Sequence, residues 1–68
     1  MSKSASPKWQ FAPQWAKYLA QDANGKWWFF SAKPVEGVNE WMCQPGQMAH
    51  EAGQGKPNAK WRDTLEAK

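Results

Sequence analysis

The sequence predicts a mainly β protein: a small three-stranded antiparallel sheet, connected as a meander, followed by a short C-terminal helix. Three observations favour this fold class. The dipeptide Asn24-Gly25 separates two apolar runs, four aromatic residues stand in a row at 27–30, and prolines and glycines interrupt the chain at short intervals. Asn-Gly between apolar runs is the strongest short-range hairpin signal, and aromatic residues favour the pleated surface of a strand.

The first two strands are expected at 14–21 and 26–32, joined by a type I′ turn. Such a turn needs positive φ at both central residues, which Asn and Gly tolerate. The second strand ends before Pro34, because proline cannot donate a hydrogen bond to a ladder. A two-residue loop pairs Gln21 with Trp28 and Leu19 with Phe30. The two faces would then hold Trp15, Leu19, Trp28 and Phe30 on one side, and Tyr18, Ala20, Trp27 and Phe29 on the other. A loop of odd length would exchange these partners and leave both faces aromatic.

The aromatic-rich β domain is expected to span 9–45. Trp9 and Phe11 alternate before Pro13, which predicts an extended arm that covers one apolar face or forms an exposed hook for a partner. The third strand is expected at 38–43, where Trp41 and Cys43 share one face and Val38 and Met42 share the other. Pro45-Gly46 ends it.

The remaining segments are predicted to be a tail, a linker and a helix. Residues 1–8 are rich in Ser and Lys and are expected to form a flexible tail. Residues 46–57 are polar and Gly-rich, as in a linker, with room for one short helical turn. Over 58–68, Asn58 is a candidate N-cap, and Trp61 and Leu65 lie four residues apart on one helix face. So short a helix either docks these side chains on the sheet or stays frayed.

Length and composition limit the choice of function. Sixty-eight residues with one cysteine form one domain at most, with no internal disulfide, and the net charge of +3 permits an acidic partner without requiring one. No apolar run approaches the roughly 20 residues of a membrane span, and none follows Met1 as a signal peptide would require. A cytoplasmic protein without membrane contact is therefore expected.

The sequence offers little for catalysis or metal binding. His50 is the only histidine and lies in a polar stretch, where a surface position is expected. Cys43 is expected to be a buried apolar side chain, and the two together fall short of the four ligands of a structural zinc site. The sequence thus predicts a protein that is not an enzyme, with no metal site and no cofactor.

A binding function is predicted instead, because six tryptophans exceed what one small sheet can hide. Exposed aromatic residues mark interaction sites and dominate interface energetics. The candidate partner-binding residues are Trp15, Tyr18, Trp28, Phe30 and Trp41. The bland alternative is that all six tryptophans are core residues.

Two resemblances bear on the function. The run Trp15, Asn24-Gly25-Lys26, Trp28-Phe29-Phe30, Trp41 and Pro45 resembles WW domains, which are three-stranded sheets that bind proline-rich peptides. The interval from Trp15 to Trp41 is longer than in WW domains, and Pro45 lies four residues after Trp41 rather than three. The resemblance therefore concerns architecture.

The second resemblance covers about two-thirds of the chain. The segments 13–22, 24–30 and 33–34, followed by Trp61-Arg62-Asp63-Thr64-Leu65, resemble small uncharacterised proteins of tailed bacteriophages and prophages. This resemblance implies a phage accessory protein that acts in the host bacterial cytoplasm. It brings no established activity and no functional residues.

Two hypotheses follow. The preferred one is a protein-interaction module that binds a host or phage protein through exposed aromatic residues. The alternative is single-stranded nucleic-acid binding, with bases stacked on aromatic rings and phosphates held by lysines. The oligomeric state stays open, because exposed sheet edges can pair two chains.

Overall fold

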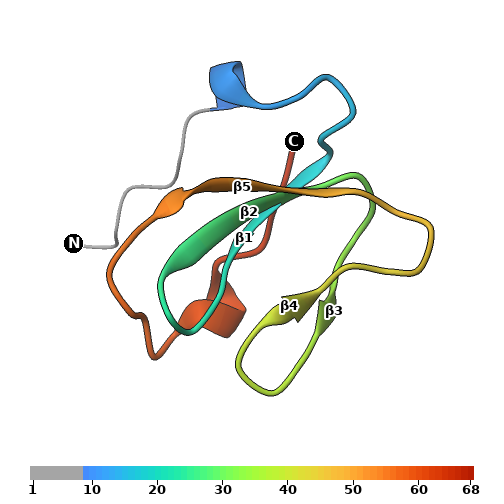
Figure 1. Cartoon of the computed structure of the whole chain (residues 1–68). Coiled ribbons are helices and arrows are strands. Elements are labelled where there is room, and N and C mark those ends of the chain that lie inside the picture. Colours follow the sequence, from blue (N-terminus) through green and yellow to red (C-terminus); the bar gives the residue numbers. More distant parts are fainter. Residues whose placement is uncertain (1–8) are drawn as a thin grey trace.

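A computed structural model describes residues 9–68, and the predicted N-terminal tail at 1–8 lies outside them. The elements in chain order are the 3-10 turn η1 (Trp9–Phe11), the strands β1 (Tyr18–Gln21), β2 (Lys26–Phe30), β3 (Val35–Glu36), β4 (Trp41–Met42) and β5 (Ala49–Gln54), the 3-10 turn η2 (Trp61–Asp63) and the strand β6 (Glu66–Ala67). The protein is mainly β, as predicted. The strands form a four-stranded antiparallel sheet in the order β5-β2-β1-β6 and a separate two-stranded sheet of β3 and β4 (Figure 1).

The hairpin β1–β2 forms where Asn24-Gly25 predicts it, but its turn is not type I′. Only Gly25 has positive φ, at 94°, and the Gly25 N–H donates to the Asp22 carbonyl at 2.9 Å. Lys26 then closes the loop by accepting a bond from the Asp22 N–H, also at 2.9 Å. This is a three-residue loop, a type I turn followed by a left-handed glycine.

The odd loop length shifts the predicted register by one residue. Leu19 pairs with Phe29 and Ala20 with Trp28, so the expected pairing of Leu19 with Phe30 is wrong. Both faces remain aromatic, as the odd-length alternative predicts. One face carries the Trp27 cluster, formed by Ala16, Leu19, Trp27 and Phe29 with Trp9, Ala12, Trp15 and Ala52 packed against it. The other carries the Trp61 cluster, formed by Ala20, Phe30, Trp41 and Trp61 with Tyr18, Ala23, Trp28 and Leu65 packed against it.

The third strand of the main sheet comes from the segment expected to be a linker. Strand β5, with the sequence AHEAGQ, pairs along β2, while the expected third strand at 38–43 contributes only β4 to the smaller sheet. The β5 residues have weak strand propensity, and none of the six is buried, so the strand shows no alternation between a buried and an exposed face. Its backbone pairing with β2, rather than its side chains, selects this structure.

The C-terminal segment does not form the predicted helix. It makes one turn, η2, and then extends as β6, which pairs with β1 at Leu19–Glu66 and Tyr18–Ala67. The Thr64 hydroxyl donates to the Trp61 carbonyl at 2.7 Å and accepts from the Gln21 N–H at 2.8 Å. A threonine side chain that satisfies backbone groups in this way competes with helix continuation. The segment nevertheless docks, since Trp61 is buried and Leu65 packs against its cluster.

The segment before β1 is a turn rather than the expected extended arm. Trp9 packs on Phe29 with ring centroids 5.6 Å apart, and its indole N–H donates to Glu66 at 3.3 Å. Phe11, by contrast, is 75% exposed. Trp9 therefore covers an apolar face, as one prediction had it, and Phe11 is exposed, as the other had it. The two side chains leave the 3-10 turn in different directions.

Candidate binding surfaces

The five predicted partner-binding residues lie on both faces of the sheet. Trp15 belongs to the Trp27 cluster, and the other four belong to the Trp61 cluster. Phe30 is only 2% exposed and Trp41 only 9%, so both are core side chains, whereas Trp15, Tyr18 and Trp28 are half-buried. The aromatic surplus is thus absorbed largely by packing on two faces, with η1 covering one and η2 covering the other.

A buried glutamine links the elements around the Trp61 cluster. Gln21 is fully buried, and its amide nitrogen donates to the Gly25 carbonyl at 2.9 Å, while its amide oxygen accepts from Asn58 at 3.0 Å. Its backbone carbonyl accepts the Trp41 indole N–H at 3.1 Å. A buried amide stabilises a fold only when its hydrogen bonds are made, and those of Gln21 join β1 to the turn, to β4 and to the segment before η2.

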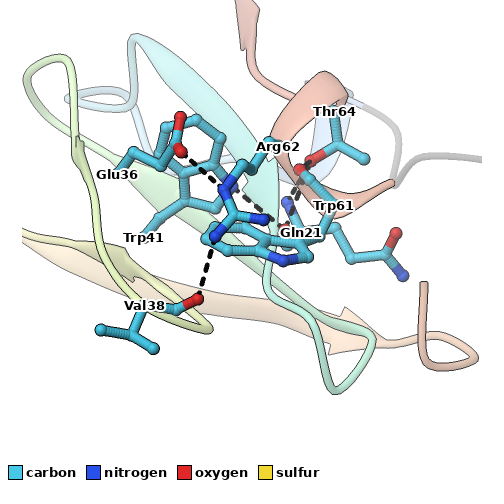
Figure 2. Close-up of polar contacts among 7 residues, drawn as sticks. All are labelled: Gln21, Glu36, Val38, Trp41, Trp61, Arg62 and Thr64. Carbon is cyan, nitrogen blue, oxygen red and sulfur yellow. Dashed lines mark hydrogen bonds and ion pairs between the residues drawn. The ribbon is translucent and has the colours of Figure 1, made fainter. Parts of the chain in front are cut away.

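Arg62 holds the β3–β4 hairpin against η2. Its guanidinium lies 4.3 Å from the centre of the Trp61 ring, Nε lies 2.6 Å from a Glu36 carboxylate oxygen, and Nη2 donates to the Val38 carbonyl at 3.1 Å. Figure 2 shows Arg62 between these groups, with the Val38 side chain pointing away from it. Arginine can make such contacts at once because its planar fork stacks and donates in different directions.

Asp22 anchors the other strand of the same hairpin. Its carboxylate accepts the backbone N–H of Trp41 at 2.8 Å, and its side chain is buried. Burial raises the pKa of this carboxyl above the ordinary 3.8, with a smaller contribution from Glu40, while the Trp41 and Trp28 hydrogen bonds and the Lys26 charge oppose the shift. The position of β4 therefore depends on a buried polar group.

The held hairpin presents aliphatic side chains to solvent. Val35 is 53% exposed, Val38 81% and Met42 51%, and Val35 and Met42 are direct partners across the β3–β4 pair. We call these three residues the hairpin patch. The sequence pattern predicts Val38 and Met42 on one strand face and does not indicate them as binding residues. The sequence indicates this exposed surface only weakly. The three residues lie between Pro34 and Pro45, in a segment too short to bury them.

The edges of the main sheet are poorly suited to pairing with another strand. Trp27 pairs with Gly53 and Trp28 with Glu51, which leaves Ala52 as an extra residue that bulges from β5. The charge of Glu51 and the bulge at Ala52 are both features that keep an edge strand from pairing with another chain. At the opposite edge, β6 has only two residues.

His50 and Cys43, the two side chains considered for catalysis or metal binding, both lie at the surface. His50 is exposed on β5, as predicted. Cys43 is exposed, not buried as predicted, and its thiol donates to the Gln47 carbonyl at 3.3 Å. Strand β4 ends at Met42, so Cys43 lies beyond the strand alternation that would have placed it on the same face as the buried Trp41. Within residues 9–68 no three His, Cys, Asp or Glu side chains converge on a possible metal position.

Over the part of the chain that the structure describes, no helix is long and apolar enough to cross a membrane.

Comparison with known proteins adds no relative. No protein-family model, curated protein or solved structure matches the chain.

Proposed function

We propose that this protein is a non-enzymatic protein-interaction module whose contact surface is the hairpin patch. The observation that carries the proposal is the exposure of Val35, Val38 and Met42 on a hairpin that Arg62 and Asp22 hold in place. Exposed apolar side chains are candidates for the apolar core of an interface. This differs from the aromatic surface that the sequence suggests.

Charge around the hairpin favours apolar recognition. Glu36 is paired with Arg62, and the two other charged side chains of the segment 33–45 are Lys33 and Glu40, which are opposite in sign. The hairpin region is therefore close to neutral. We expect binding through it to depend weakly on salt, since little charge is brought together.

The hairpin patch is the centre of the proposed interface rather than all of it. A standard interface buries about 800 Å² per partner, roughly a sixth of this protein's 4624 Å² of accessible surface. Exposed polar residues around the patch would supply the rim. The resemblance of the sequence to tailed-phage proteins makes a host bacterial protein the partner that we propose, with action in the host cytoplasm.

The test is affinity capture from nuclease-treated bacterial lysate with the wild-type chain and with Val38→Asp and Val35→Asp. Phe11→Asp is the matched control, because Phe11 is also highly exposed but lies outside the hairpin. We expect one discrete protein to be retained by the wild type and by the Phe11 variant and lost from the two hairpin variants.

Two further measurements make the result decisive. Thermal melting of each variant must match the wild type, so that loss of binding is not loss of fold. Light scattering during gel filtration shows whether the wild type self-associates. Equal capture by all variants, or a self-association that Val38→Asp abolishes, would contradict a host partner at this surface.

A further inference from the structure

The loop between β1 and β2 contains a chemically labile peptide group. Of the three asparagines in the chain, only Asn24 is followed by glycine. The backbone nitrogen of the next residue can attack the carboxamide carbon of an asparagine, and a glycine hinders this attack least because it has no Cβ. The Asn24 side chain is exposed to solvent. The dipeptide 24–25 is therefore a candidate site for deamidation.

Deamidation at this dipeptide takes two steps. The Gly25 nitrogen attacks Cγ of Asn24 and forms a cyclic succinimide, while the carboxamide nitrogen leaves as ammonia and carries away the proton that the Gly25 N–H loses. A water molecule then opens the ring at one of its two carbonyl carbons. Opening at Cγ gives aspartate. Opening at the main-chain carbonyl carbon gives isoaspartate, in which the main chain runs through Cβ and Cγ. No group is oxidised or reduced.

The folded loop keeps the reacting atoms apart. Ring closure requires the Gly25 nitrogen to eclipse Cβ of Asn24 about the Asn24 Cα–C bond. At the third residue of a type I turn ψ is near 0°, so this nitrogen eclipses the Asn24 nitrogen instead, and Cβ lies about 120° of rotation away. The carboxamide is also engaged, since Oδ1 of Asn24 accepts the Lys26 N–H at 2.9 Å. Attack therefore requires the 24–25 peptide group to rotate.

That peptide group is held at both ends. Its N–H, from Gly25, donates to the Asp22 carbonyl at 2.9 Å. Its carbonyl, from Asn24, accepts the side-chain amide of Gln54 at 3.1 Å. The next carbonyl, that of the buried Gly25, accepts the Gly55 N–H at 2.7 Å. Rotation breaks both bonds of the peptide group, so it belongs to molecules in which the loop has opened.

We propose that Asn24 is a deamidation site that the β1–β2 loop protects, so that it reacts only in molecules whose loop is open. The two products should differ in stability. Aspartate keeps an oxygen that accepts the Lys26 N–H and suits a turn. Isoaspartate adds one atom to the main chain beside Gly25, where even an added Cβ would overlap the Gly55 carbonyl oxygen. A loop that forms isoaspartate therefore cannot close as before.

Loss of this loop would also affect the β3–β4 hairpin. The Ala23 N–H donates to the Asn39 carbonyl at 3.1 Å, and the Asp22 carboxylate accepts the Trp41 N–H at 2.8 Å. Both contacts come from the turn that contains Asn24. We therefore expect isoaspartate to destabilise the fold as a whole. This inference does not depend on what the hairpin patch binds.

The test is incubation of the full chain at mildly alkaline pH, which favours loss of the amide proton. One sample is folded, and the other is unfolded in guanidinium chloride, with the ionic strength matched by sodium chloride. Peptide mapping by mass spectrometry follows each asparagine over time. We expect Asn24 to react at least about a hundredfold more slowly in the folded chain, the protection that the stability of so small a domain provides. Asn39 and Asn58 are internal references, since neither precedes glycine.

Gln54→Ala tests the hold on the peptide group. It removes the bond to the Asn24 carbonyl, and we expect deamidation in the folded chain to become roughly two- to tenfold faster, the effect of one hydrogen bond on an opening equilibrium. Gln47→Ala is the matched control. Gln47 is also an exposed glutamine, but its side chain accepts a bond from Ser31, outside the loop. Its variant should react at the wild-type rate.

The products are then separated by chromatography and melted. The isoaspartate form should melt at a lower temperature than the unmodified chain, whereas Asn24→Asp should melt close to the wild type. Equal rates for Asn24 in the folded and unfolded chain, or equal rates for the two glutamine variants, would overturn the proposed protection. An Asn24 that reacts no faster than Asn39 in the unfolded chain would overturn the site itself. An isoaspartate form with an unchanged melting temperature would overturn the difference between the products.

Discussion

The rings of Trp41 and Trp61 meet edge to face, with centroids 5.6 Å apart and planes inclined by 83°. This contact joins β4 to η2, which are far apart in the sequence. Neither element is part of the main sheet. Edge-to-face aromatic pairs add about 0.5–1.5 kcal/mol beyond the area that they bury. The hairpin patch is therefore positioned by the core, through Trp41.

Replacing Trp61 by Ala should remove most of the stability. Loss of a buried tryptophan costs about 3–5 kcal/mol, and the core of so small a domain supplies only about that much. Urea unfolding followed by circular dichroism measures the loss. Phe11→Ala, at a mostly exposed ring, should change the unfolding free energy by less than about 0.5 kcal/mol. Similar unfolding midpoints for the two variants would show that Trp61 is not a core residue.

Gly25→Ala should destabilise the β1–β2 hairpin by about 1–3 kcal/mol. Gly25 has a φ of 94°, and a Cβ there would overlap the carbonyl oxygen of Gly55. Both the backbone angle and the close approach of 55–56 therefore oppose a side chain. Gly46→Ala is the matched control, since Gly46 also has positive φ, 78°, but nothing lies within 4 Å of its added Cβ. Equal losses in the two variants would mean that the contact with Gly55 contributes nothing.

Asp22→Asn should become more favourable, relative to the wild type, as the pH rises. The folded pKa of Asp22 lies above 3.8, so the folded state retains this proton to higher pH than the unfolded state does. The contribution of Asp22 to stability is thus fully present below pH 3.8 and is lost as the pH rises through the raised pKa. Asparagine stays neutral and can still accept the Trp41 N–H.

The measurement for Asp22 is the difference in unfolding free energy between Asp22→Asn and the wild type at a series of pH values. Taking the difference cancels the other carboxylates, which titrate in both proteins. A difference that stays constant from acidic to neutral pH would show that burial does not perturb Asp22.

Cys43 should react with a thiol reagent in the folded protein. Its side chain is exposed, and its one hydrogen bond, to the Gln47 carbonyl, is weak for a thiol donor. We expect iodoacetamide to label it at a rate that changes little when urea is added below the unfolding midpoint. Labelling that appears only as the protein unfolds would restore the buried cysteine that the sequence pattern suggests.

Local chemistry accounts for the parts of the fold that are correctly predicted from the sequence. The Asn24-Gly25 signal places the hairpin, and the aromatic run at 27–30 places its second strand, because turn geometry and strand propensity act over a few residues. The exposed position of His50 follows from its polar surroundings. Each of these features depends on neighbours in the sequence.

The two segments that were predicted wrongly, 46–57 and 58–68, depend instead on contacts with distant strands. The segment 46–57 resembles a linker because the strand β5 draws its stability from the backbone of β2 rather than from its own side chains. The segment 58–68 resembles a helix because Trp61 and Leu65 are four residues apart, yet Thr64 and the free edge of β1 favour an extended chain. A propensity of a few tenths of a kcal/mol per residue cannot compete with pairing to a preformed sheet.

The candidate binding surfaces lie beyond what a single sequence can specify. Which aromatic rings are buried depends on the odd loop length, which sets the faces of β1 and β2, and on the docking of η1 and η2 from the two ends of the chain. That docking places Phe30 and Trp41 in the core and leaves Val38 exposed.

By itself the sequence determined a β-rich fold around one aromatic hairpin, since turns and strand propensity are local. Only the tertiary structure decided the register, the partner strands β5 and β6 and the exposed hairpin patch. These features depend on contacts between residues far apart in the chain, and burial and long-range backbone pairing set their energies.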